Sequence, residues 1–479
     1  MKTKTIEPKK LIYKLRDLRE GFPRTRVLER NMPEYVAELE GAQKKARKFG
    51  QKHIEPVALE LDKKMEYDHD YFPWDIVRAG LPYRFLSAIV PKAFGGVGYL
   101  TAHMAVMVEE MCSFCPGIAN IFGAHALGLA PILMAPDIRM YERYMRQVTE
   151  AEKKGKPLLF ALAITESAAG SDMEDADFLR TARLVTTARK VKGGYVLNGR
   201  KVFISNGSVA RYIWVAAVLD RERPVETSVS FVIPDDAKGF SVGTIEKKLG
   251  QRACPAAELV FDDVFVPEED RLGDIGEAER LTALVLGGSR APVAAIATGI
   301  ARGAFERLLK YLNETRVRGR WLFEEQWVQM ALVDMLGKIQ AARQLFLDAS
   351  MACDFFGVPK LMRHPSMKFL NGLPQPVLKT RAMHRSFTSR RMYDFVRGLV
   401  DRHVEDSDIN LIAAYSSIAK YRASDLAVEV CSRAMDIMGP DGAAVEYGVE
   451  KALRDAKLTQ IYEGTNQINR LYVYKQSLV

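Results

Sequence analysis

The sequence lacks the cysteine and histidine patterns that mark disulfide frameworks and metal sites. Its 479 residues include five widely spread cysteines and seven scattered histidines. Cys112 and Cys115 form a single CxxC on a segment of helical periodicity, with neither a second pair nor a nearby histidine. We therefore expect reduced thiols and no bound metal.

Nucleotide fingerprints and targeting signals are also missing. No GxGxxG follows a predicted strand, and neither a P-loop nor a GxSxG elbow occurs. The longest apolar runs are shorter than the roughly 20 residues of a membrane-spanning helix, and the N-terminus resembles neither a signal nor a transit peptide. We expect a cytoplasmic protein with no membrane-spanning segment and no nucleic-acid partner, which holds any cofactor in another way.

Positive charge is concentrated in two segments. The net charge is +9, yet residues 1–33 contain ten Lys and Arg against four Asp and Glu, and residues 357–404 contain ten against two. The rest of the chain is slightly acidic, which is ordinary for an enzyme. The second segment is amphipathic, and three roles stay open for it: a helix packed on the body, a docking surface for an acidic protein, or a peripheral contact with an anionic membrane.

Three regions differ in the period of their apolar residues. Residues 34–157 have helical spacing, residues 158–273 contain short β-rich runs between turn signals, and residues 274–479 return to long helical patterns. The predicted fold is α+β and mainly α: an N-terminal helical domain, a small central β-barrel or sandwich, and a C-terminal four-helix bundle. Residues 1–33 form a basic N-terminal extension, and residues 354–407 approximately form an insertion in the bundle.

Two strand-to-turn motifs in the β region have the composition of a cofactor site. The stretch from Thr165 to Asp172 follows an apolar strand, and its small residues would let backbone N–H groups approach a flat or anionic ligand. Phe203 and Ser205 lie two apart on a strand, which places a ring and a hydroxyl on one face. Each motif also has an ordinary structural interpretation, as a capped turn and as a hairpin with a core phenylalanine.

Four motifs taken together resemble the acyl-CoA dehydrogenase family. They are the two above, the end of the β region from Lys248 to Pro267, and IYEGTNQINR at residues 461–470. They occur in family order and at family spacing, and the resemblance covers roughly residues 35–472. It implies FAD between sheet and bundle, oxidation of an acyl-CoA to the trans-2-enoyl-CoA, transfer of electrons to an electron-transfer flavoprotein or a similar acceptor, and a homodimer or homotetramer.

The resemblance also implies roles for individual residues. Glu463 matches the glutamate that removes the α-proton, while the β-hydrogen leaves as hydride to flavin N5. Some relatives place this carboxylate instead at the position of Ser289, which cannot supply it. Residues matched to FAD contacts are Ile164, Thr165, Gly170, Ser171, Phe203, Ser205, Arg316, Arg318, Gln326, Gly439, Thr465 and Gln467. Residues expected at the substrate are Ser171, Arg290, Tyr462 and Gly464.

Two segments depart from the family pattern. Residues 315–319 read TRVRG where the family has Arg-x-x-Phe-Gly for the neighbouring subunit's FAD, so Arg316 or Arg318 would supply the positive charge. Residues 436–440 read DIMGP in place of Gln-x-x-Gly-Gly, which removes a backbone donor and adds a carboxylate near the expected phosphate. FAD contacts across a subunit interface are therefore open.

Other functions also stay open. A specialised relative would act on cyclic, aromatic-pathway or dicarboxylyl-CoA thioesters, although the mostly apolar stretch 116–128 has no arginine for a distal carboxylate. An oxidase would differ only in the exposure of the reduced flavin. A non-catalytic CoA-ester-binding or scaffold protein is the alternative of a different class, and Glu463, Thr465 and Gln467 argue against it.

Overall fold

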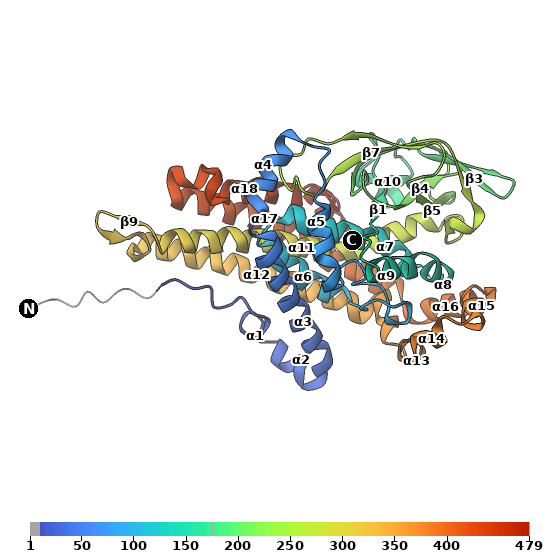
Figure 1. The fold of residues 1–479 in the computed structure, drawn as a ribbon, viewed down its shortest axis with the longest axis horizontal. Helices are drawn as coiled ribbons and strands as arrows, with labels where there is room; N and C mark the ends of the chain where they lie inside the picture. The colour runs from blue at the N-terminus through green and yellow to red at the C-terminus, as the bar shows by residue number, and fades with distance from the viewer. Residues whose placement is uncertain (1–9, 136, 175, 479) are drawn as a thin grey trace, which may run out of the picture.

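Helices precede and follow a central sheet in the computed structural model, which describes residues 10–135, 137–174 and 176–478 (Figure 1). The N-terminal helices are α1 (Leu18–Gly21), α2 (Thr25–Asn31), α3 (Pro33–Phe49), α4 (Ala58–Tyr67), α5 (Trp74–Gly80), α6 (Thr101–Cys112), α7 (Pro116–Met134), α8 (Ile138–Met140) and α9 (Arg146–Lys153). Almost every residue of α6 is buried, because α3, α7, α11 and α12 surround it.

The central region is one eight-stranded sheet. Its strands are β1 (Phe160–Ala163), β2 (Thr187–Val191), β3 (Gly194–Ser205), β4 (Tyr212–Val218), β5 (Ser228–Pro234), β6 (Phe240–Ile245), β7 (Ala256–Pro267) and β8 (Arg271–Leu272), with the short helix α10 (Ala176–Leu179) between β1 and β2. The strand order is β6-β7-β3-β2-β4-β5-β8, and β1 pairs in parallel with β4. Alternate residues of β3 and β7 fill a separate apolar core, as the period of two predicts.

Long helices form the C-terminal bundle. They are α11 (Glu277–Leu312), α12 (Gln326–Phe356), α17 (Asp406–Met438), α18 (Val449–Thr459) and α19 (Asn466–Ser477), and the hairpin of β9 (Arg316–Val317) and β10 (Arg320–Trp321) joins α11 to α12. The predicted fold class is confirmed. By length and composition α7 and α11 could each cross a membrane, but 72% of each apolar window is buried inside the protein, as in core helices of other proteins.

The insertion is a set of short helices packed on the body. It comprises η8 (Val358–Arg363), α13 (Pro365–Gly372), α14 (Gln375–Leu378), α15 (Arg381–Phe387) and α16 (Arg390–His403). Phe387 is buried against Phe94, and Arg397 pairs with Asp274 and Glu277 at 2.9 and 2.8 Å. The apolar side chains of this amphipathic segment are therefore divided between α15 and α16, and Phe387 is turned into the core.

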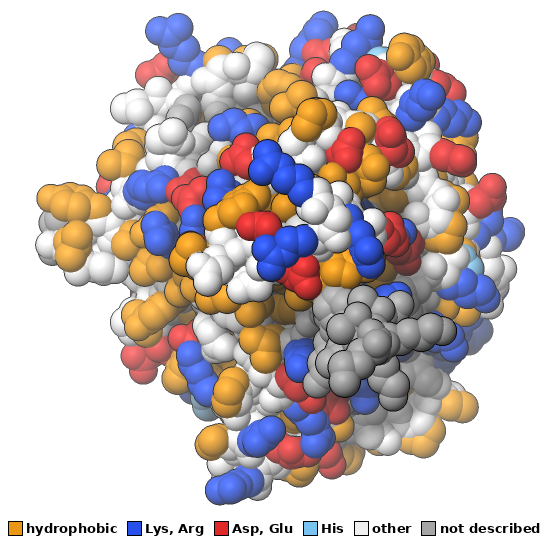
Figure 2. All heavy atoms as spheres, turned by 90° about the vertical axis from the view of Figure 1, so that its left-hand side faces the viewer, with side chains coloured by type: hydrophobic (Ala, Val, Ile, Leu, Met, Phe, Trp, Pro, Cys, Tyr) orange, Lys and Arg blue, Asp and Glu red, His pale blue; other side chains and the backbone are white. Residues whose placement is uncertain are grey.

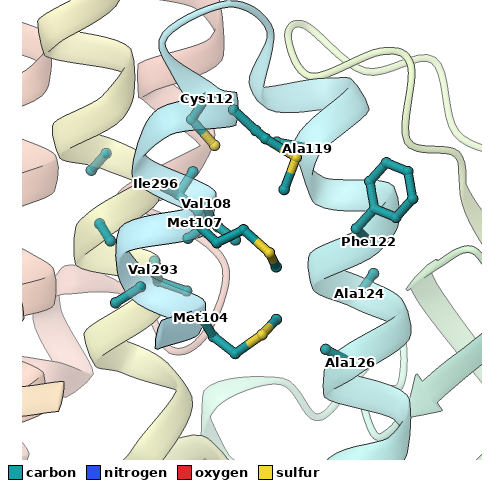
Figure 3. Packing of buried hydrophobic residues seen from close by; sticks show 14 of the residues in the cluster. Met104, Met107, Val108, Cys112, Ala119, Phe122, Ala124, Ala126, Val293 and Ile296 are labelled. Atoms are coloured by element: carbon teal, nitrogen blue, oxygen red, sulfur yellow. The ribbon is translucent and has the colours of Figure 1, made fainter. Parts of the chain in front are cut away.

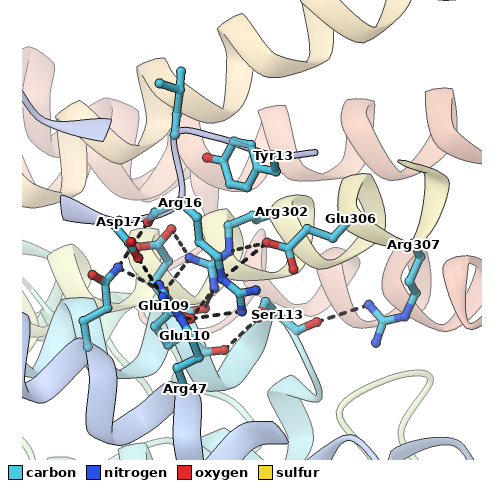
Figure 4. A network of polar contacts seen from close by, with 12 residues as sticks. Tyr13, Arg16, Asp17, Arg47, Glu109, Glu110, Ser113, Arg302, Glu306 and Arg307 are labelled. Atoms are coloured by element: carbon cyan, nitrogen blue, oxygen red, sulfur yellow. Dashed lines mark hydrogen bonds and ion pairs between the residues drawn. The ribbon is translucent and has the colours of Figure 1, made fainter. Parts of the chain in front are cut away.

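A buried network of charges joins the N-terminal extension to the bundle (Figure 4). Arg302 of α11 pairs with Glu109 and Glu110 of α6 at 2.9 Å each, and Arg343 of α12 pairs with Glu109 at 2.8 Å. Arg343 also donates to the carbonyl of Arg16 at 2.9 Å. The described part of the extension is thus packed on the protein, and residues 1–9 lie outside the described residues.

The Glu110→Gln variant should lose stability in a pH-dependent way. Burial alone would raise the pKa of Glu110, but Arg302, Arg47 and Arg16 outweigh it and hold that pKa at about 2. The substitution leaves buried arginine charge uncompensated, at a cost of about 3–5 kcal/mol measured by urea unfolding at pH 7. A carboxylate with a lowered pKa stabilises the fold above its usual pKa of 4.5 and loses this effect as the pH falls through 2, so the difference between the proteins should shrink over that range.

The matched control is Glu269→Gln, which removes an exposed carboxylate that pairs with Arg143. Surface pairs of this kind contribute about 0–1 kcal/mol. Equal unfolding midpoints for all three proteins would contradict a stabilising role of the buried network.

Candidate active site

A cavity of about 1400 Å³ lies where α6, α7, α11, β3 and the loop before α19 meet. Side chains from all three regions line it, and most of them are apolar. The predicted site residues on its wall are Ile164, Thr165, Gly170, Ser171, Phe203, Ser205, Tyr462, Glu463, Gly464 and Thr465. Those that do not line it are Arg290, Arg316, Arg318, Gln326, Gly439 and Gln467. Motifs almost 300 residues apart in the sequence therefore share one wall.

The loop that carries Glu463 has an unusual backbone. Glu463 and Gly464 have φ values of 53° and 76°, so two successive residues adopt the left-handed conformation. For a side chain such as glutamate this costs about 1–3 kcal/mol, which surrounding contacts must offset. Thr465 ends the loop by capping α19, where its side chain accepts a hydrogen bond from the Ile468 N–H at 3.3 Å.

Buried polar side chains hold this loop in place. Lys420 of α17 is fully buried, and its ammonium donates to the Gly464 carbonyl at 2.5 Å and to Asn466 Oδ1 at 3.0 Å. The Asn469 amide donates to the carbonyls of Gly464 and Thr465 at 2.9 and 3.0 Å. These bonds satisfy backbone groups that the loop cannot pair internally.

The Glu463 carboxylate is half-buried on the cavity wall and contacts α11. The Ser289 hydroxyl donates to Glu463 Oε2 at 2.5 Å. A hydrogen bond to a carboxylate is stronger than one between neutral groups, so Ser289 fixes the orientation of this acid. Arg290 does not line the cavity: it is buried, donates to Ser417 Oγ at 3.0 Å and lies 5.2 Å from the Tyr472 ring.

Gln251 joins the β domain to the same loop. It is fully buried with φ at 49°, and its amide donates to the Tyr462 hydroxyl at 3.2 Å and to the Asp455 carbonyl at 3.0 Å. Burial raises the pKa of Tyr462 far above its usual value, so this hydroxyl stays protonated. Thr465 adds a second link, because its N–H donates to Ser171 Oγ at 3.3 Å.

The β domain also presents an aromatic ring to the cavity. Phe203 has 61% of its surface exposed and φ at 60°, at a register shift between β3 and β7. Behind it, the fully buried Lys201 donates to the Ile164 carbonyl at 2.8 Å and to Glu166 at 2.9 Å. Burial lowers the pKa of Lys201, while Lys201 overcomes the effect of burial on Glu166 and lowers the pKa of that acid.

These features fit a flat, polar-edged cofactor. An exposed phenylalanine held in a strained conformation is available for stacking, the backbone of Ile164 and Thr165 is fixed beside it, and a Cβ atom added to Gly170 would meet no atom within 4 Å. The described residues contain no group of three or more His, Cys, Asp or Glu that could hold a metal ion. The sequence analysis assigned no role to Gln251 and Asn469, although both lie within the motifs quoted above. It missed Lys420 and the contact of Ser289 with Glu463, which no contiguous motif contains.

Models of the N-terminal, middle and C-terminal domains of acyl-CoA dehydrogenases match this chain. The matches cover residues 37–152, residues 161–264, and residues 280–370 with 382–478. The gap in the third match falls within the insertion.

Similar proteins have related names. A short-chain specific acyl-CoA dehydrogenase of Clostridium acetobutylicum is 29% identical over 89% of this chain and 94% of its own length. A cyclohex-1-ene-1-carbonyl-CoA dehydrogenase of Geobacter metallireducens is 31% identical over the same shares. The structure of butyryl-CoA dehydrogenase from Megasphaera elsdenii superposes with a TM-score of 0.73 at 28% identity, covering 92% of this chain and 98% of that one.

The Lys420→Met variant should loosen the loop without unfolding the bundle. Methionine fills a similar volume but leaves the Gly464 carbonyl and Asn466 without the ammonium donor, at a cost of about 1–3 kcal/mol. Hydrogen exchange read by mass spectrometry should become faster over residues 461–469 and stay unchanged in β3. Lys338→Met, which removes an exposed lysine on α12, is the control. Unchanged exchange in the loop would contradict the anchoring role of Lys420.

Proposed function

Because this chain belongs to the acyl-CoA dehydrogenase family and is an oxidoreductase acting on acyl-CoA with FAD as its cofactor, we propose that it converts an acyl-CoA into the trans-2-enoyl-CoA, with Glu463 as the base. The observation that carries the proposal is the Glu463 carboxylate, oriented by Ser289 on the wall of a mainly apolar cavity that Phe203 also lines. A protein used only to bind CoA esters has no need of an acid held in this way.

Glu463 would remove the α-proton of the thioester. The proton is a very weak acid, so the negative charge that develops on the thioester oxygen must be stabilised as the proton leaves. The Glu463 N–H would donate to this oxygen, and Gly464 lets the backbone pass close to it because glycine has no side chain. The apolar wall keeps water from solvating the carboxylate, which keeps it reactive as a base.

FAD would lie against the β-domain wall. Ile164, Thr165, Phe203 and Ser205 would hold the ring system, and the backbone around Gly170 and Ser171 would contact the phosphates. When bound, FAD supplies the two-electron oxidation and accepts the β-hydrogen. Arg316, Arg318, Gln326, Gly439 and Gln467 lie off the cavity of their own chain, and we propose that they contact the FAD of a second copy.

We further propose an electron-transfer flavoprotein as the acceptor, since a structure of this fold at 28% identity comes from work on such a protein. An alicyclic substrate is the second candidate, because relatives about 30% identical are dehydrogenases of cyclohexene- and cyclohexane-carbonyl-CoA.

The decisive experiment mixes the FAD-loaded protein anaerobically with butyryl-, octanoyl- and cyclohexane-1-carbonyl-CoA and follows flavin absorbance. The absorbance should bleach with the natural protein, whereas Glu463→Gln should retain FAD and bleach about 10²–10⁴-fold more slowly, because a general base contributes on that order. The control is Glu446→Gln, which changes an exposed acid in the turn before α18. Equal bleaching rates for Glu463→Gln and the natural protein would refute the assignment.

The Ser289→Ala variant should show whether Ser289 orients the Glu463 carboxylate or binds the substrate. Without the hydroxyl the carboxylate samples other positions, so kcat should fall by about 10–100-fold, equivalent to the 1.5–3 kcal/mol of a hydrogen bond to a charged group. KM should change little, and Ser289→Thr, which retains a hydroxyl, should recover most of the rate. A rate for Ser289→Ala equal to that of the natural protein would show that this bond does not orient Glu463.

A further inference from the structure

The cavity continues past Glu463 to the insertion. Its wall includes Met104 and Val108 of α6, Ala124 and Ala126 of α7, and Val293 and Ile296 of α11. Figure 3 shows the Met104 side chain extending from α6 toward Ala124 and Ala126. The wall also includes residues at the end of α12 and in the insertion: Cys353, Gly357, Val358, Pro359, Met362, Arg363, Lys368, Asn371 and Gly372. The insertion thus forms part of the same cavity wall as the acid.

A gap in the surface of α11 opens the way from Glu463 to this part of the wall. Gly288 precedes Ser289, and a Cβ atom added there would meet no atom within 4 Å. Pro292 lies four residues later and has no N–H, so it cannot bond the Gly288 carbonyl as a regular helix would. Cys353 Sγ lies 3.9 Å from that carbonyl, which brings the end of α12 to the edge of the gap.

The insertion is fixed where it meets the cavity. Val358 and Leu361 form a small apolar cluster with which Leu284 of α11 and Met134 of α7 pack. Leu284 lies five residues before Ser289, or roughly 7.5 Å along the helix axis. Asp354 is fully buried and accepts hydrogen bonds from the N–H of Thr101 and Ala102 at 2.7 and 3.1 Å, which fixes the end of α12 to the start of α6.

The lining of this branch is apolar, and its charged groups have both signs. Lys92 pairs with Glu38 at 3.3 Å, and the Arg363 guanidinium lies 5.7 and 5.0 Å from the rings of Tyr35 and Phe355. Lys368 and Glu34 are both exposed, so they belong to the rim. This mixture gives no preference for an anionic tail, whereas the apolar wall favours a hydrocarbon one.

We propose that η8 forms the distal wall of the acyl-binding cavity, and that the physiological substrate has an apolar acyl group longer than butyryl whose tail passes Gly288 and contacts Met362. The proposal rests on the dehydrogenase function proposed above. It makes Met362 a residue that determines specificity and gives the insertion a role in substrate selection.

The test compares kcat/KM for butyryl-, hexanoyl-, octanoyl- and dodecanoyl-CoA in the FAD-loaded full chain. Met362→Trp narrows the branch, so kcat/KM for the longest oxidised thioester should fall at least about tenfold, within the range that one or two mismatched methylenes produce. The value for butyryl-CoA should stay unchanged. Phe369→Trp places the same side chain on an exposed site of the insertion and should alter neither value. Met362→Ala, which widens the branch, should shift the preference toward longer chains.

Several outcomes would overturn the proposal. Equal effects of Met362→Trp on short and long thioesters, or none on either, would show that η8 does not contact the tail, and so would an unchanged chain-length preference in Met362→Ala. A higher kcat/KM for adipoyl-CoA than for hexanoyl-CoA would show that an anionic tail is selected. Failure of the natural protein to oxidise any thioester would instead contradict the proposed dehydrogenase function. The experiment thus distinguishes an error in that function from an error in the role of η8.

Discussion

The paired charges of α6 with α11 and α12 determine where the site can form. Glu109 and Glu110 are fully buried with Arg302 and Arg343, and removing any one partner would leave a charge without compensation. A shift of α11 or α12 along α6 would break these ion pairs as well as the apolar packing. The register of α11 along α6 brings Gly299 so close to α6 that an added Cβ atom would lie 2.4 Å from the Glu109 carbonyl. The faces of α6 and α11 that form the cavity depend on this fixed contact.

Three residues that line the cavity have a strained backbone. Phe203, Gln251 and Glu463 all have positive φ values, although each comes from a different segment. Bonds to other elements hold two of them: Gln251 bonds to the Asp455 carbonyl, and the Glu463 loop is bonded by Lys420 of α17 and Asn469 of α19. The packed domains thus maintain conformations that isolated segments would not adopt, and they present the ring and the acid to one cavity.

Sequence patterns predicted the parts of this protein that depend on local chemistry. The helix–sheet–helix succession follows from the apolar periods, and the motifs around Thr165, Phe203 and Glu463 were found because each is contiguous. Lys420 could not be found in this way, because a lysine on an apolar helix is equally consistent with an exposed position. The Ser289 contact depends on how α11 crosses a loop 174 residues away, and no local pattern encodes that crossing. In the insertion the sequence left open a helix packed on the body, a docking surface and a membrane contact. The amphipathic stretch forms two helices, α15 and α16, and Arg397 of α16 pairs with Asp274 and Glu277.

The ion pairs of the insertion bear on the role of its positive charge. Lys379 pairs with Glu150, and Arg397 with Asp274 and Glu277, so part of the positive charge of the insertion attaches it to the protein. The face that carries the β9–β10 hairpin also mixes both signs with apolar patches, rather than presenting one basic surface (Figure 2). Docking to an acidic partner or membrane would have to compete with these internal pairs. The insertion is attached to the body through Lys379 and Arg397, and η8 lines the cavity with Val358, Pro359 and Met362. This arrangement is better suited to shape a binding site than to recruit a partner.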